Sequence, residues 1–143
     1  MDPISAVALV VSCLQLASDA ASVIRDIQTL YEKFKGAEHN IQLLLVQVSS
    51  IKTASTQISS WLERTREEND ELFTQLGMSL AACGSLMNLI HAHVDKVNGG
   101  ARRKLGWRGK MKHLWEEGTV KEYQGMLQVQ VQALSLLLQV MKL

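Results

Sequence analysis

Proline and cysteine are both scarce in this chain of 143 residues, which contains one proline and two cysteines. The proline is Pro3, and no later proline interrupts the chain. Because proline breaks helix interiors but is tolerated in a first helical turn, this placement favours long, uninterrupted helices. Cys13 and Cys83 lie far apart in apolar surroundings, which argues against a disulfide framework and indicates a reducing compartment.

The chain also lacks an excess of charge of either sign, since it has 15 Lys and Arg residues against 14 Asp and Glu residues. A molecule this close to neutral has no overall electrostatic attraction to nucleic acid. Charged residues make up 20% of the chain and apolar residues 47%, which is typical of a globular domain. We expect residues 1–143 to form a single domain with a sizeable core.

Patterns that carry catalytic or metal chemistry are missing as well. His91 and His93 are two residues apart and would project from different faces of a helix, and two isolated cysteines do not have zinc-binding spacing. Gly99-Gly100 and the segment 106–110 lack the spacing of a phosphate-binding loop. We therefore expect a protein that is not an enzyme and that has no metal or cofactor site.

Apolar residues recur at helical spacing along most of the chain. Asn69 or Asp70 is expected to cap one helix, and Thr119 with Glu122 forms a capping-box pattern at the start of another. Asn98-Gly99-Gly100 is the clearest loop signal. The expected helices cover residues 3–34, 37–64, 70–97 and the segment from 119 onward, with a short helix over 107–116.

The apolar stripes of these helices predict the fold. In the second helix, Gln47, Ser55 and Ser59 lie off the expected stripe. The stripe found in the first helix comprises Ile4, Val7, Val11, Leu14, Ala17, Ala21, Ile24, Ile27, Tyr31 and Phe34. Four long stripes with short connections predict an all-α protein, an antiparallel four-helix bundle with an additional short helix.

The N-terminal run is the most distinctive segment, because it carries no charge between Asp2 and Asp19. As a helix this run would be about 24 Å long, whereas the hydrocarbon core of a bilayer is about 30 Å thick. Burial in the bundle, conditional insertion into a membrane, and cleavage as a signal are the three interpretations. The absence of Lys or Arg before Arg25 argues against a signal peptide. We expect the run to be buried in the resting domain.

A basic segment from Lys96 to Lys112 contains no acidic residue. Basic residues beside an aromatic anchor suit an anionic membrane surface or a nucleic-acid backbone. The other interpretation is a solvated loop whose tryptophans pack on the bundle. The residues that would contact anionic lipid are Lys96, Arg102, Arg103, Lys104, Arg108, Lys110, Lys112 and Trp107.

Two segments carry a family resemblance. The opening Met1 to Ala17, and Trp107 to Trp115 with the later helix ending in Leu134 to Leu138, resemble the N-terminal domains of fungal STAND (NLR-like) receptors. These domains look like the HeLo and HeLo-like class. That class is compared with the four-helix bundle of the mixed-lineage-kinase-like necroptosis executioner and with plant RPW8-type domains.

The resemblance implies a cell-death or heterokaryon-incompatibility effector, the N-terminal domain of a longer innate-immunity receptor. Such a domain is cytoplasmic at rest, relocates to the plasma membrane on activation, oligomerises and permeabilises the membrane. Its first helix leaves the bundle to do so. The residues that would enter the membrane are Ile4, Val7, Leu9, Val10, Val11, Leu14 and Leu16.

Other functions stay open from the residues alone. A non-lytic module would use its apolar last helix and methionine-containing stripes for homotypic contact or for recruiting a partner. Nucleic-acid binding through the basic segment is disfavoured, because the net charge is only +1 and no recognised motif accompanies the segment. Self-association and contact with anionic lipid are thus the partners we expect, together with receptor domains outside this chain.

Overall fold

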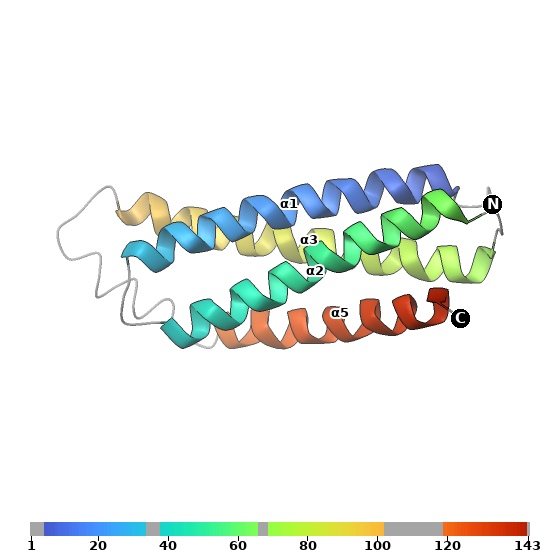
Figure 1. The fold of residues 1–143 in the computed structure, drawn as a ribbon. Coiled ribbons are helices and arrows are strands. Elements are labelled where there is room, and N and C mark those ends of the chain that lie inside the picture. The colour runs from blue at the N-terminus through green and yellow to red at the C-terminus, as the bar shows by residue number, and fades with distance from the viewer. Residues whose placement is uncertain (1–4, 34–37, 66–68, 102–118, 143) are drawn as a thin grey trace.

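A computed structural model of the chain describes residues 5–33, 38–65, 69–101 and 119–142. Within these ranges the backbone forms four α-helices and no strand (Figure 1). The predicted all-α helical bundle is therefore confirmed. The short helix predicted over 107–116 lies outside the described residues. The helices are α1 (Ala6–Lys33), α2 (Glu38–Arg64), α3 (Asp70–Ala101) and α5 (Thr119–Lys142).

Side-chain caps mark the starts of two helices. The backbone N–H of Ala8 donates to Ser5 Oγ at 3.1 Å, so Ser5 caps α1. The N–H of Leu72 donates to Asn69 Oδ1 at 3.1 Å, which makes Asn69 rather than Asp70 the cap of α3. These bonds satisfy donors that a first helical turn leaves without partners. α5 begins at Thr119, as its capping-box pattern predicts.

The loop predicted at Asn98-Gly99-Gly100 is wrong, because α3 continues to Ala101. Glycine in a helix costs about 1 kcal/mol relative to alanine, but it adopts helical dihedral angles freely. The preceding turns are held by Ile90 and Val94, which are buried in the core. The final turn of α3 therefore extends a helix that is already anchored.

The four helices form a ring in which α1 and α5 each pack against both α2 and α3. Gln47, early in α2, contacts Gln124, early in α5, and these two helices run in the same direction (Figure 1). Asp26, late in α1, contacts His91, late in α3, and these two also run in the same direction. The starts of α1 and α3 and the ends of α2 and α5 accordingly lie at one end of the bundle (Figure 1).

Side chains from all four helices build one hydrophobic core. Gln47, Ser55 and Ser59, which the sequence placed off the core stripe, are buried within it. The Ser55 hydroxyl donates to the Ile51 carbonyl of its own helix at 2.8 Å, and the Gln47 side-chain amide donates to a carbonyl of α5. Small or long polar side chains can thus enter this core because a backbone acceptor lies within reach.

Candidate functional site

Helix α1 exposes a row of large apolar side chains along its first half. Val7, Val11 and Leu14 are spaced i, i+4 and i+7 and therefore lie on one side of the helix. Their exposed fractions are 74%, 61% and 57%. We call these three residues the outer stripe. Scattered exposed apolar residues are ordinary on protein surfaces, but an aligned row on one helix indicates a contact surface.

The opposite side of α1 is buried in the bundle. Leu9, Cys13 and Leu16 belong to the core, and we call these three residues the inner stripe. The predicted membrane-insertion residues are therefore divided between two faces: Leu9 and Leu16 point inward, and Val10 is half-buried against the core. Ile4 lies outside the described residues. The expected burial of the N-terminal run is thus wrong for its outer stripe.

A signal in the sequence marks Val7 as outward-facing, although the stripe proposed for the first helix passed through it. Arg25 follows Val7 by 18 residues, which is five helical turns, so the two side chains share one side of α1. Arg25 is exposed, and the side opposite it carries the buried residues Val23, Ile27 and Leu30. Periodicity alone could not choose the core face, because both faces of the first half are apolar.

The outer stripe belongs to a larger zone without charge. No Asp, Glu, Lys or Arg occurs in residues 5–18 of α1, 53–62 of α2, 72–90 of α3 or 123–141 of α5. Residues 5–18 and 53–62 lie at the end of the bundle at which α1 begins, together with the first part of 72–90 and the second half of α5 (Figure 1). The side surface around the outer stripe therefore offers little electrostatic resistance to an apolar environment.

The predicted basic segment is represented by one residue, Lys96, which is exposed near the end of α3. The other members, Arg102, Arg103, Lys104, Trp107, Arg108, Lys110 and Lys112, lie outside the described residues. Lys96 and Val7 stand near opposite ends of the bundle, because α1 and α3 run in the same direction (Figure 1). The structure therefore does not place Lys96 beside the outer stripe.

A histidine–carboxylate contact and a half-buried histidine connect α3 to its neighbours. His91 Nδ1 lies 2.7 Å from Asp26 Oδ2 of α1, and both side chains are partly exposed. His93 packs edge-on against the ring of Tyr123 on α5, with ring centroids 5.5 Å apart. Burial lowers the pKa of His93, and the nearby positive charge of Lys96 lowers it further. The His93 ring is therefore held in its neutral form more firmly than a solvated histidine.

Both cysteine thiols are shielded from solvent in the folded bundle. Cys13 and Cys83 are fully buried and free of disulfides. Burial raises the pKa of each thiol to about 11, because the thiolate would lose its hydration. Since the thiolate is the reactive form, burial disfavours reaction at either thiol in this state.

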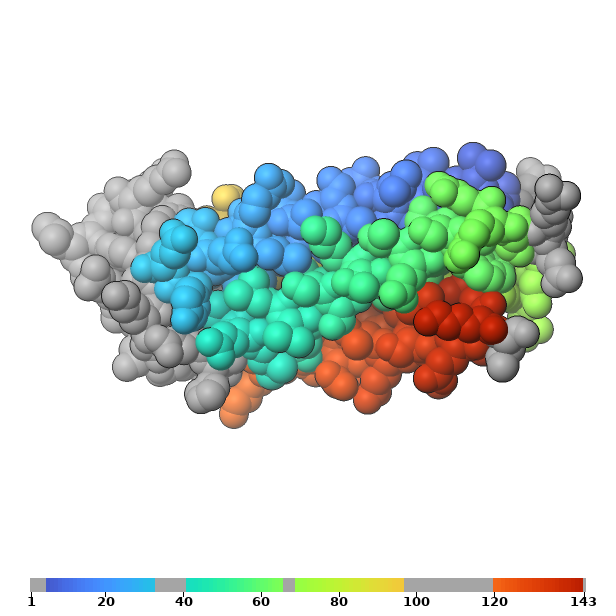
Figure 2. All heavy atoms as spheres, in the orientation of Figure 1, coloured from blue at the N-terminus to red at the C-terminus, as the bar shows by residue number. Residues whose placement is uncertain are grey.

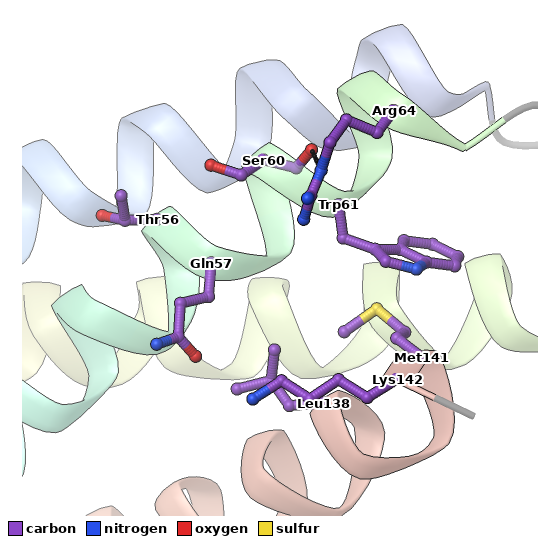
Figure 3. Close-up of a pocket in the computed structure, with 8 residues that line it drawn as sticks. All are labelled: Thr56, Gln57, Ser60, Trp61, Arg64, Leu138, Met141 and Lys142. Carbon is purple, nitrogen blue, oxygen red and sulfur yellow. Dashed lines mark hydrogen bonds between the residues drawn. The ribbon is translucent and has the colours of Figure 1, made fainter.

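A pocket that no sequence pattern indicated lies between α2 and α5, where the two helices meet on the face drawn in Figure 2. The Arg64 side chain is held there by a hydrogen bond from its Nε to the Ser60 carbonyl at 3.1 Å. Apolar and polar groups mix in the lining without a pair suited to acid–base catalysis. The lining residues are Thr56, Gln57, Ser60, Trp61, Arg64, Leu138, Met141 and Lys142 (Figure 3).

Two helices have the length and composition of a membrane span, Ala6–Glu32 and Asp70–Lys96. Core helices of soluble proteins can also meet this criterion. In the most apolar stretch of each helix, 28% of the residues are buried in the first helix and 39% in the second. Length and composition therefore do not distinguish a membrane span from a core helix, and both helices expose large apolar side chains, Val7, Val11 and Leu14 on α1 and Met78 and Leu89 on α3.

Among the described residues no three His, Cys, Asp or Glu side chains gather as metal ligands would. Comparisons of the chain with protein-family models, with curated proteins and with solved structures found no match. Function is therefore inferred from the exposed surfaces of the described helices, beginning with the outer stripe of α1.

Proposed function

We propose that this chain is a membrane-active effector domain, a helical bundle that self-associates and permeabilises a membrane through its first helix. The observation that carries the proposal is the outer stripe, three large apolar side chains exposed on a segment without charge. The resemblance of the opening segment to HeLo-like domains supports the same activity. Cell death and heterokaryon incompatibility are the outcomes that this class of domain produces.

The first step is docking of the outer stripe at the lipid surface. Each Val or Leu transferred fully from water to hydrocarbon contributes about 1.5–3 kcal/mol. Val7, Val11 and Leu14 start from exposed positions, so docking needs no change in the core. Three such residues on one helix supply several kcal/mol, which is in the range of reversible interfacial binding.

The second step is release of the inner stripe. Leu9, Cys13 and Leu16 must leave the core before α1 can be surrounded by lipid or by other copies of α1. The uncharged segment 5–18 would be about 21 Å long as a helix, shorter than a hydrocarbon core of about 30 Å. A single α1 would therefore not span the bilayer, and several copies lining one lesion are required.

The proposal includes the cellular setting that the resemblance implies. The domain would be the N-terminal part of a longer fungal receptor, cytoplasmic at rest and moving to the plasma membrane on activation. Two free buried thiols suit a reducing compartment. Lys96 and the basic residues that follow it would add attraction to anionic lipid. The bundle itself would be antiparallel in its chain order, with a short helix over 107–116.

Dye release from vesicles of phosphatidylcholine and phosphatidylserine tests the proposal. The variant V11Q/L14Q removes two members of the outer stripe without touching the core. The matched control is L43Q/V46Q on α2, because Leu43 and Val46 are exposed by 45% and 62% against 57% and 61% for Leu14 and Val11. We expect V11Q/L14Q to lose at least about tenfold in leakage, since each lost apolar contact weakens membrane binding, and L43Q/V46Q to leak like the wild type.

Equal leakage from V11Q/L14Q and the wild type would overturn the proposal, and so would an absence of leakage from the wild type at any protein concentration. Deleting residues 1–18 is a poorer test than substitution, because it would remove Leu9, Cys13 and Leu16 from the core. Circular dichroism with thermal melting shows whether both variants keep the wild-type fold.

The alternative is a non-lytic module that associates with itself or recruits a partner. A second exposed apolar face, on α5, favours this alternative. Such a protein would ignore vesicles at physiological salt and still form dimers or larger species in sedimentation. The two functions thus make opposite predictions for leakage by the wild-type protein.

A further inference from the structure

We infer that the outer face of α5 is the docking surface for a second copy of this chain, with the two α5 helices packed side by side in opposite directions. The face is a row of apolar side chains that lies apart from the core-facing side of the same helix. We call this row the α5 seam. Its members are Met126, Val129, Ala133, Leu136 and Val140.

The spacing of the α5 seam is that of a coiled-coil interface. Successive members are separated by three, four, three and four residues, which is the heptad spacing that keeps a row facing a partner helix. Val129 and Leu136 are exposed by 60% and 63%. Leu127 and Leu134, on the inner side of α5, are fully buried. The helix thus has one apolar row for its own bundle and a second that nothing in the described bundle covers.

The chemistry around the seam indicates which partner fits it. Residues 123–141 contain no charged side chain, and Gln132 and Gln139 flank the row. A partner of opposite charge would find no ion pair to make here. An apolar row between neutral, hydrogen-bonding flanks is instead complementary to itself, as a two-fold interface requires. A second copy of this chain is therefore the occupant that we assign.

End charges set the direction of the pairing. Glu122 is an exposed residue four positions before Met126, so it extends the seam by one turn. Parallel packing would bring two Glu122 side chains together. Packing in opposite directions about Ala133 instead places the two Glu122 side chains at opposite ends of the interface, and it also opposes the two helix dipoles. Repulsion between the like charges and the opposition of the helix dipoles thus favour the antiparallel pair.

The apolar surface continues from α5 onto α3. His93 faces α5, since its ring contacts Tyr123. Leu89 lies one turn before His93 on the same side of α3, and Met78 lies on that side three turns further back. Both Leu89 and Met78 are exposed large hydrophobic residues. A second copy seated on the α5 seam would therefore also cover part of α3.

The size of the seam predicts a weak dimer. Five seam residues cover about two heptads, fewer than the three to four heptads of a stable isolated coiled coil. Interfaces of this kind fall at the small end of specific association, where a high local concentration is needed. This inference rests on the self-association within the proposed function. Because α1 and α5 are diagonal in the ring, the outer stripe would stay free for lipid.

Sedimentation velocity without lipid tests the docking surface. The variant V129E/L136E places two charges on the seam at positions that do not touch the core. We expect wild type to shift from monomer to dimer as concentration rises, and V129E/L136E to stay monomeric with at least about a tenfold weaker association, since buried unpaired charges oppose contact. The control L43E/V46E on α2, with similar exposure, should associate like the wild type.

Cross-linking tests the direction. The variants M126C and V140C are mixed and treated with a short bis-maleimide, which leaves the native thiols unmodified because both are buried. Antiparallel pairing about Ala133 places position 126 opposite position 140, so the mixed M126C–V140C species should predominate. Predominance of M126C–M126C dimers would overturn the antiparallel assignment.

Strictly monomeric wild type at the highest soluble concentration would overturn the docking surface, and so would V129E/L136E that associates like the wild type. Failure of the membrane proposal and failure of the α5 docking surface give different combinations of leakage and sedimentation results. If V11Q/L14Q leaks like the wild type while V129E/L136E is monomeric, the membrane role of α1 fails and the α5 seam stands. If V11Q/L14Q loses leakage and V129E/L136E still associates, the α5 seam fails alone.

Discussion

The side-chain amide of Gln47 on α2 donates a hydrogen bond to the backbone carbonyl of Gln124 on α5, at 3.0 Å. The same nitrogen lies 3.4 Å from Gln128 Oε1. Gln47 is buried, so if these acceptors were lost, water could not reach its amide to take their place. This contact joins two helices that run in the same direction and helps fix their relative height.

The variant Q47A should therefore destabilise the bundle. It removes a buried donor and leaves the space of the side chain unfilled, so we expect a loss of about 1–3 kcal/mol in the free energy of unfolding. Urea denaturation followed by circular dichroism measures this value. The control is Q42A on the same helix, since Gln42 is exposed and should change stability by less than about 0.5 kcal/mol. Equal effects of the two variants would show that the interhelical bond contributes nothing.

His93 should make the bundle less stable in mild acid. Burial and then Lys96 lower its pKa from the ordinary value of 6.5. The unfolded chain therefore takes up the proton first as pH falls, so stability is complete above about pH 6.5 and declines below it. Tyr123, the aromatic neighbour from α5, is uncharged throughout this range.

The variant H93F keeps an aromatic ring beside Tyr123 and removes the titration. Urea midpoints measured between pH 7.5 and pH 5 (a range centred near the ordinary histidine pKa of about 6.5) should fall more steeply for the wild type than for H93F. Parallel pH profiles would show that His93 is protonated as easily in the folded state as in the unfolded state.

The all-α class and most of the helix positions follow directly from the sequence. In α2 and α3 the apolar residues that recur at helical spacing include core residues such as Leu44, Ile51 and Leu76. In α1 the first half is apolar on both sides, and the stripe through Val7 looked as regular as the one through Leu9. Packing of α1 against α2 and α3 determines which of the two stripes is buried, and this tertiary contact cannot be read from the sequence of α1 alone.

Other features depend on contacts that no local pattern contains. The pocket beside Trp61 exists because α2 and α5, far apart in the chain, lie side by side. Burial of Ser59 depends on the packing of neighbouring helices, since serine is more often exposed. The division of α1 into an outer and an inner stripe is predictable only in part. The sequence shows which residues are apolar, but it does not show which of them face the core.

That division leads to a prediction in which stability and activity change in opposite directions. L16A removes part of the inner stripe, leaves a cavity, and should lower the free energy of unfolding by about 2–5 kcal/mol. The same change weakens the hold of the bundle on α1, so release of the inner stripe becomes easier. We therefore expect L16A to increase dye release from vesicles of phosphatidylcholine and phosphatidylserine, although the protein is less stable.

General instability could also raise leakage, and L127A separates the two causes. Leu127 is as deeply buried as Leu16, but it lies on α5, diagonal to α1 in the ring. Its truncation should destabilise the bundle by a similar amount without specifically loosening α1. At temperatures chosen to give equal free energies of unfolding, L16A should release dye faster than L127A. Identical rates would mean that global unfolding, rather than departure of α1, limits membrane damage.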